Sequence, residues 1–175
     1  MMPPIHFQKW AEENRDLLRP PVGNKMLFKE NGFIVMAVGG PNSRTDFHYN
    51  EGPEFFYQVK GKLILRICEN DKISDVTVNE GEVFLLPPKT PHSPQREKDS
   101  VGLVLERSRL ENERDGLLWY CGSCSFLLYE NYFKLKNIET DFPPVFDAFY
   151  ASLEHRTCRR CGAIHPSLKK RTDEN

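Results

Sequence analysis

The chain has 175 residues, of which 39% are hydrophobic, so it can build one well-packed core and a small appendage. The charges of its 24 basic and 25 acidic residues nearly cancel. The chain therefore has no overall positive electrostatic field that would draw it to nucleic acid or an anionic membrane. The sequence carries no signal-peptide pattern and no apolar run of membrane-spanning length. We therefore expect a cytoplasmic protein with a small-molecule site.

The first half of the chain predicts a short helix followed by a barrel of strands. Residues 7–18 place apolar side chains at roughly helical intervals, and two prolines then forbid continuation. Short apolar strands follow, separated by turns rich in glycine, asparagine and proline; the clearest are 33–38, 62–68, 82–86 and 101–105. Such a series predicts an antiparallel sandwich or barrel, in which loops after different strands can meet.

Two segments of this predicted barrel carry metal-capable side chains. His48 and Glu54 lie just before a strand-like segment, and His92 lies between two prolines in a rigid turn. Two histidines and one carboxylate hold non-haem Fe(II) on one face and leave positions open for substrate and oxygen. Each alone would pass as a surface residue, but together they favour a metal site. The remaining histidines lack such context and are expected to be surface or capping residues: His6, His155 and His165.

The spacings of these residues resemble the two motifs of the cupin family. Glu54 and Gly61, preceded by His48, are similar to the first motif. The second motif is matched by three residues, Gly81, Pro87 and His92. The resemblance implies an all-β fold dominated by a double-stranded β-helix, or jelly-roll, barrel with a few flanking helices.

Three positions depart from the usual cupin pattern. Asn50 replaces the second histidine of the first motif, which reduces the usual four ligands to three. Lys89 stands where glycine is common, and Arg96 where asparagine is common. An arginine this close to His92 would place a fixed cation beside the metal, suited to a substrate carboxylate.

The last third of the chain predicts a second unit built on two cysteine pairs. The charged segment 109–117 is typical of a linker. The two C-x2-C knuckles, Cys121/Cys124 and Cys158/Cys161, resemble a rubredoxin-like or zinc-ribbon site with four thiolates around one metal. This closed site is expected to be structural and remote from the chemistry. His165 could serve as a spare ligand.

The segment between the knuckles predicts one strand and one helix. Residues 126–129 favour a strand, and residues 145–153 carry an apolar stripe at helical spacing after two prolines. The stripe is expected to be core, a cover for the barrel or a dimer contact. The predicted division is thus 1–108 for the cupin barrel with its N-terminal helix, 109–117 for the linker and 118–175 for the four-cysteine unit with a C-terminal helix. Cys68, on a strand, is expected to be a small buried hydrophobe.

Together, the barrel motifs and the paired knuckles resemble the bacterial and fungal 3-hydroxyanthranilate 3,4-dioxygenases. The likeness is carried by GGPNSRTDFH, PEFFYQVKG, FLLPPKTPHSPQR, LVLERSR, WYC and the knuckles. It implies Fe(II)- and O2-dependent ring cleavage of 3-hydroxyanthranilate to 2-amino-3-carboxymuconate semialdehyde, which cyclises to quinolinate on the kynurenine route to NAD. It implies catalytic iron on His48, Glu54 and His92, and a second iron or zinc on the four cysteines. The implied substrate contacts are Arg44, Glu54, Arg96 and Glu106.

Residue chemistry suggests a role for each of these contacts. Arg96 is assigned to the substrate carboxylate through a bidentate ion pair. Arg44, four residues before His48, is expected near the oxygen site, where it would stabilise developing negative charge. Glu106 could accept hydrogen bonds from the substrate's amino or hydroxyl group and act as a base. Alternatively, or in addition, Glu106 is a buried partner of an arginine such as Arg44 or Arg96.

Other functions of a cupin scaffold stay open, because fold alone excludes neither a metal-dependent isomerase nor a non-catalytic small-ligand sensor. The basic residues of 156–160, with Lys169, Lys170 and Arg171, are expected to be a solvated tail and not a nucleic-acid surface. The aromatic helix stripe and the family resemblance both favour a homodimer. Whether the pathway serves NAD synthesis or aromatic catabolism depends on information outside the sequence.

Overall fold

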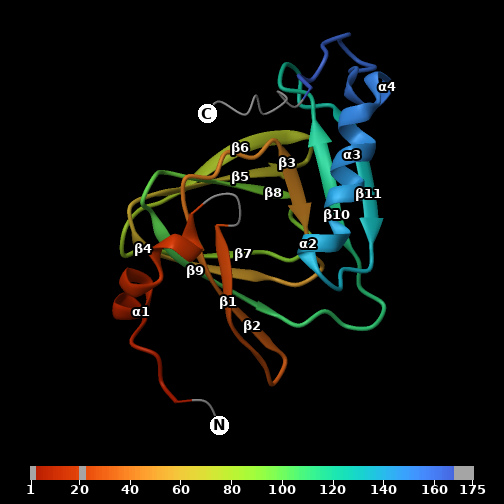
Figure 1. Ribbon diagram of the computed structural model, residues 1–175. Coiled ribbons are helices and arrows are strands. Elements are labelled where there is room, and N and C mark those ends of the chain that lie inside the picture. Colours follow the sequence, from red (N-terminus) through yellow and green to blue (C-terminus); the bar gives the residue numbers. More distant parts are fainter. Residues whose placement is uncertain (1–2, 20–22, 168–175) are drawn as a thin grey trace, which may run out of the picture.

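The computed structural model describes residues 3–19 and 23–167, which form a β-barrel with short helices at its sides (Figure 1). One sheet contains β1 (Asn24–Glu30), β2 (Phe33–Gly39), β4 (Glu54–Lys60), β7 (Val83–Leu86) and β9 (Val101–Arg107). The other contains β3 (Asp46–Tyr49), β5 (Leu63–Glu69), β6 (Lys72–Val78), β8 (His92–Arg96), β10 (Asp115–Tyr120) and β11 (Leu127–Phe133). Their orders in the described residues are β1-β2-β9-β4-β7 and β11-β10-β3-β8-β5-β6, with every pairing antiparallel. The predicted cupin barrel is confirmed.

The barrel core lies between the two sheets. Strand alternation turns every second side chain of β4 and β5 inward, so Phe56 from one sheet packs with Leu63 and Leu65 from the other. All three are almost fully buried. Val104 on β9 and Leu86 on β7 complete this cluster. These apolar residues fix the inward face of β4, and Glu54 lies on that same face at the beginning of the strand.

The N-terminal segment folds into two short helical turns where one helix was expected. These are α1 (Phe7–Glu13) and the 3-10 helix η1 (Arg15–Leu18). The break occurs at Asn14, whose side-chain amide donates to the carbonyl of Trp10 at 2.8 Å and ends the α-helix. Ala11 and Leu18 then pack on Ala37 of β2, so the segment covers part of the outer face of the five-stranded sheet.

The C-terminal helices are α2 (Ile138–Asp141), α3 (Pro143–Ala151) and α4 (Leu153–Arg156). The expected apolar stripe is core: Val145 and Phe149 are buried against Trp119 of β10, with the Phe149 and Trp119 ring centroids 4.4 Å apart. The continuous stripe ends at Ser152, which caps α4, and Leu153 is exposed. No helix within the described part is long and apolar enough to cross a membrane. Lys169, Lys170 and Arg171 lie outside the described residues.

The predicted linker is the main point at which the sequence interpretation differs from the fold. β10 begins at Asp115, inside the expected linker 109–117, and pairs with β3 of the barrel. Figure 1 shows β10 and β11 continuing the barrel's sheet, with α3 lying along them. The expected strand at 126–129 is the first part of β11, which runs on to Phe133. The four-cysteine segment is therefore attached to the barrel through a shared sheet.

Candidate active site

Three metal-capable side chains meet inside the barrel. His48 on β3 and His92 on β8 are cross-strand neighbours, and Glu54 faces them from the other sheet. Nδ1 of His48 lies 3.7 Å from Oε1 of Glu54, and Nε2 of His92 lies 3.3 Å from Oε2. One ligand atom from each residue falls within 4.8 Å of the others. Two imidazoles and one carboxylate at this spacing fit a divalent iron.

The outer ring nitrogens of both histidines have acceptors, which sets their tautomers. Nδ1 of His92 lies 3.0 Å from the carbonyl oxygen of Thr90, and Nε2 of His48 lies 2.7 Å from Oδ2 of Asp115. Since a carbonyl and a carboxylate both accept, we assign an N–H to each of these outer nitrogens. If a metal bound between these residues, Nδ1 of His48 and Nε2 of His92 would be the nitrogens that present lone pairs to it beside Glu54.

The electrostatics of the site keep Glu54 ionised. Burial alone would raise the pKa of Glu54, but the charges and hydrogen bonds of His92, with His48 and Asn50, lower that pKa to about 2. Burial would likewise lower the pKa of His92, and the nearby Glu54 carboxylate raises it. Glu54 and His92 are 4% and 2% exposed, so little water competes with these interactions.

Asn50 occupies the place of the missing fourth ligand with a bridging amide. Its Nδ2 donates to Oε1 of Glu54 at 3.2 Å and to Oε2 of Glu106 at 3.0 Å. Its Oδ1 accepts from the backbone N–H of Gly52 at 2.9 Å, which fixes the amide orientation. Asn50, in place of a fourth ligand, therefore links the carboxylates of Glu54 and Glu106, which are register partners on β4 and β9.

Glu106 is buried, and its partner is not one of the two arginines that we expected. Arg109 donates to its Oε1 at 2.6 Å, whereas Arg44 pairs with Asp46 and Arg96 with Gln58. Burial raises the pKa of Glu106, the charge of the nearby Glu54 adds to this effect, and Arg109 opposes it. Glu106 is thus the buried partner of an arginine, as expected, but the arginine is Arg109 and not Arg44 or Arg96, because the loop after β9 folds back to supply it.

Arg44 lies beside the three-residue cluster on the segment that leads into β3. The side-chain amide of Gln95 holds the backbone of Arg44. Its Oε1 accepts from the Arg44 N–H at 3.1 Å, and its Nε2 donates to the Arg44 carbonyl at 3.0 Å. Burial would lower the pKa of Arg44, but Asp46, with a smaller contribution from Glu54, raises it. The guanidinium is thus close enough for its charge to act on Glu54.

Arg96 lies four residues along β8 from His92, on the same inward side of the strand. Its Nη1 donates to Oε1 of Gln58 at 3.0 Å, and burial lowers the pKa of Arg96 to about 10. Gly102 on β9 leaves the space for this pair, since a Cβ there would lie 2.9 Å from Nη1 of Arg96. The barrel therefore holds a buried arginine whose charge has no carboxylate partner among the contacts of the described residues.

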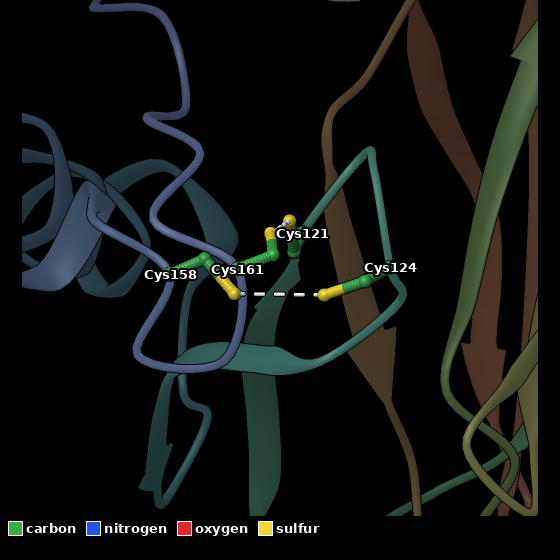
Figure 2. Close-up of side chains that lie close together, drawn as sticks. All are labelled: Cys121, Cys124, Cys158 and Cys161. Carbon is green, nitrogen blue, oxygen red and sulfur yellow. Dashed lines mark hydrogen bonds between the residues drawn. The ribbon is translucent and has the colours of Figure 1, made fainter.

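The four cysteines meet at the far end of β10, where their side chains point toward one another from two loops (Figure 2). The sulfur atoms of Cys121 and Cys161 lie 3.6 Å apart, as do those of Cys124 and Cys158. A tetrahedron of metal–sulfur bonds of about 2.3 Å has edges of about 3.8 Å, so the cluster fits one metal ion. Burial would raise the pKa of Cys158, but backbone N–H groups of Cys161 and Arg160 lower it to about 6, which favours the thiolate.

The other histidines stay outside both clusters in the described residues. His6 caps α1, accepting from the N–H of Lys9 at 3.4 Å, as expected of a capping residue. His155 stacks on Tyr129 with ring centroids 4.4 Å apart, and His165 packs edge-on against Phe149. His165 is therefore an aromatic packing residue here and not a spare ligand. Cys68 is buried, as expected.

Comparisons with known proteins show which family this chain is similar to. The family described as 3-hydroxyanthranilic acid dioxygenase matches residues 1–150. A protein of Xanthomonas euvesicatoria named 3-hydroxyanthranilate 3,4-dioxygenase is 59% identical over 170 residues, which cover 97% of this chain and 96% of that relative. The chain belongs to this dioxygenase family. A Burkholderia cenocepacia protein of the same name is 48% identical and covers 97% of both chains. Among solved structures, a cupin-2 domain protein from Shewanella frigidimarina matches at 15% identity with a TM-score of 0.48, covering 59% of this chain and 94% of that one.

The dioxygenase site includes residues that our reading of the sequence missed. Asp115 and Arg109 fall in the segment that we took for a linker, and Gln58 and Gln95 were not singled out. Asp115 carried one signal, because it immediately precedes the apolar run GLLW and so begins a buried strand. Gln58 and Gln95 carried none, since a glutamine on a strand is ordinarily a surface residue.

Proposed function

We propose that this chain is a 3-hydroxyanthranilate 3,4-dioxygenase, which uses Fe(II) and O2 to open the ring of its small aromatic substrate. The observation that carries the proposal is the buried, three-ligand cluster of His48, Glu54 and His92 in a chain that belongs to this family. Fe(II) bound there would offer open positions where a chelating substrate and dioxygen could be held together.

Arg96 is the proposed anchor for the substrate carboxylate. Its buried guanidinium bonds only to a neutral amide, Gln58, among its described contacts, and a buried cation gains most from an anionic partner. A substrate carboxylate would supply that partner, and a catechol without one would leave the cation uncompensated. Arg96 would therefore select the carboxylate-bearing substrate as well as orient it.

Glu106 and Arg44 are proposed to act on opposite sides of the bound substrate. Glu106 is an inward-facing carboxylate beside Glu54, and its raised pKa makes it a better proton acceptor than an exposed carboxylate. It would accept a proton from the substrate's hydroxyl or amino group. Arg44 lies near enough for its charge to act on Glu54 and would stabilise negative charge that develops on oxygen.

The four cysteines are proposed to hold a second iron or zinc ion with a structural role. Four thiolates close a tetrahedral site completely, which leaves no position for a substrate. Each knuckle contains backbone turns that bring its cysteines together, including Gly162 with φ +75°, a value that favours glycine. Cysteine pairs that bind a metal as thiolates are typical of a reducing compartment, which supports a location in the cytoplasm.

The protein is further proposed to act as a homodimer through the outer face of its five-stranded sheet. Val83 and Leu85 on β7 are 59% and 61% exposed, and their register partners on β4 are Tyr57 and Phe55. Phe55 in turn pairs with Leu105 of β9. A contiguous apolar face on a sheet is typical of a protein interface, and a second copy of this chain would cover it.

The experiment that tests the function is oxygen uptake by the purified chain, reconstituted anaerobically with Fe(II), on addition of 3-hydroxyanthranilate. We expect one O2 consumed per substrate, with both oxygen atoms in a ring-opened product identified by mass. Iron-loaded protein that binds the substrate without consuming oxygen would overturn the proposal in favour of a ligand sensor. 3-Hydroxybenzoate, which keeps the carboxylate and the hydroxyl but lacks the adjacent amino group, serves as the matched control and should give no uptake.

A further inference from the structure

Arg109 lies between two buried carboxylates and uses every donor nitrogen of its guanidinium. Nη1 donates to Oε1 of Glu106 at 2.6 Å, Nε to Oδ1 of Asp115 at 3.0 Å, and Nη2 to Oδ2 of Asp115 at 2.7 Å. Asp115 is fully buried and Glu106 is 6% exposed. A planar, five-donor fork is the one side chain that can hold two carboxylates in fixed directions at once.

Asp115 in turn fixes the orientation of His48, one of the three proposed metal ligands. Its Oδ2 accepts from both Arg109 and Nε2 of His48. Asp115 is the first residue of β10, and Leu117 on the same strand is the register partner of His48. The sheet thus sets the distance, and the carboxylate sets the tautomer, so that Nδ1 of His48 faces Glu54.

Glu106 connects Arg109, through Asn50, to Glu54, another of the three proposed metal ligands. Its second oxygen accepts from Asn50, whose amide also donates to Glu54. Glu54 in turn lies 3.7 Å from Nδ1 of His48. Hydrogen bonds therefore connect the two proposed ligands His48 and Glu54 through Asp115, Arg109, Glu106 and Asn50.

We propose that Arg109 is a positioning residue that couples the metal-ligand side of the site to its substrate side. Through Asp115 it holds His48 ready to bind iron, and through Glu106 it holds the carboxylate that meets the substrate. A change that reorients Glu106 on substrate binding is thereby transmitted to His48, and a change at His48 is transmitted to Glu106. This follows because Glu106 and Asp115, which holds His48, share the guanidinium of Arg109. The inference rests on the proposed roles of His48 and Glu106.

The first test needs no metal. In the iron-free protein, long-range 15N–1H spectra of the histidine side chains distinguish the two neutral tautomers. We expect His48 to carry its proton on Nε2 and His92 on Nδ1. Asp115→Asn should move the His48 proton, since an amide cannot accept from both Arg109 and His48 without placing one donor against another. A wild-type His48 with its proton on Nδ1 would overturn the inference.

The second test measures the coupling at equilibrium. Fe(II) dissociation constants, obtained by chelator competition, are compared for Arg109→Gln and the matched control Arg66→Gln, whose arginine pairs with Asp75 on the outside of the barrel. We expect iron affinity to fall about 10- to 100-fold in Arg109→Gln, the range for residues that orient a metal ligand, and to stay unchanged in the control. KM for 3-hydroxyanthranilate should rise in Arg109→Gln at saturating iron.

A double variant separates positioning from loss of folding. If Arg109 acts on the metal through Asp115, combining Arg109→Gln with Asp115→Asn should weaken iron binding little more than either change alone. Fully additive losses would contradict the shared path. Arg109→Lys keeps the positive charge but lacks the planar set of guanidinium donors. Wild-type iron affinity and KM in this variant would contradict the bridging role. His48→Ala tests the ligand assignment itself: if it keeps iron, the proposed function fails, whereas iron loss there with a silent Arg109→Gln overturns this inference alone.

Discussion

The two candidate metal sites lie near opposite ends of β10 and are built in opposite ways. The three-residue cluster sits inside the barrel, where Glu54 and His92 are almost fully buried, whereas Cys161 of the four-cysteine cluster lies exposed at the surface. The first needs partners such as Asn50 and Asp115 to hold its ligands, because three side chains from three strands do not fix one another. The four-cysteine cluster needs no such partners, since each knuckle brings two thiols together within four residues.

This difference separates a site for chemistry from a site for stability. A cluster with three protein ligands leaves coordination positions open, and its surrounding residues tune what binds there. A closed set of four thiolates has none and contributes folding free energy when metal binds. The two sites are nevertheless connected, because Asp115 at one end of β10 holds His48 and Cys121 follows directly after the other end.

The largest effect is expected from Glu54→Ala. It removes the carboxylate from the cluster and leaves Asn50 and His92 without their buried partner, so iron binding and turnover should both be abolished. Metal content after reconstitution, with oxygen uptake on the same sample, checks this. Glu51→Ala, which changes a nearby carboxylate that contacts Arg114 and Lys89, should keep iron. Retained iron in Glu54→Ala would show that the ligands lie elsewhere.

Arg96→Ala is expected to separate substrate binding from iron binding. Hydrogen bonds to a charged group contribute about 1.5–3 kcal/mol, so KM should rise roughly 10- to 100-fold while iron affinity stays near wild type. Steady-state oxygen uptake and chelator competition measure the two quantities. The preference for substrates with a carboxylate should weaken in the same variant. An unchanged KM would remove Arg96 from the substrate site.

Cys124→Ser should act on stability and leave the chemistry in place. Losing one of four thiolates weakens the structural metal, and we expect the midpoint of thermal unfolding to fall on the order of 10 °C. Turnover per iron-loaded chain should remain within about two-fold of wild type, because no knuckle residue contacts the three-ligand cluster in the described structure. Lost turnover with an intact fold and dimer would contradict a purely structural role and point to transmission along β10.

Leu85→Glu is expected to have the smallest effect on turnover. It places a charge in the exposed apolar face of the five-stranded sheet, so it should shift the protein from two copies to one without altering turnover per chain. Sedimentation velocity measures the change. Thr77→Glu, at an exposed position on β6 of the other sheet, is the matched control and should leave the mass unchanged. A Leu85→Glu protein with unaltered mass would place the contact between copies elsewhere.

The motif spacings predicted the three-ligand cluster because its geometry is encoded locally. His48 and Glu54 lie near the two ends of one turn between β3 and β4, whereas His92, which we expected in a rigid turn, begins the strand β8. The cysteine pairs are even more local. By contrast, the partners of Glu106 and Arg96 could not be predicted, since Gln58, Asn50 and Arg109 reach them from other elements.

The sequence by itself determined the barrel, the three side chains that cluster as candidate ligands and the family resemblance, because strand alternation and ligand spacing are short-range properties of the chain. Only the tertiary structure decided that the charged segment before Cys121 is part of the sheet and of the site. Asp115 and Arg109 are polar residues that local composition assigns to solvent. Asp115 is fully buried and the Arg109 side chain is only 15% exposed, because each neutralises the other beside His48 and Glu106, and such pairing exists only once β10 has joined β3.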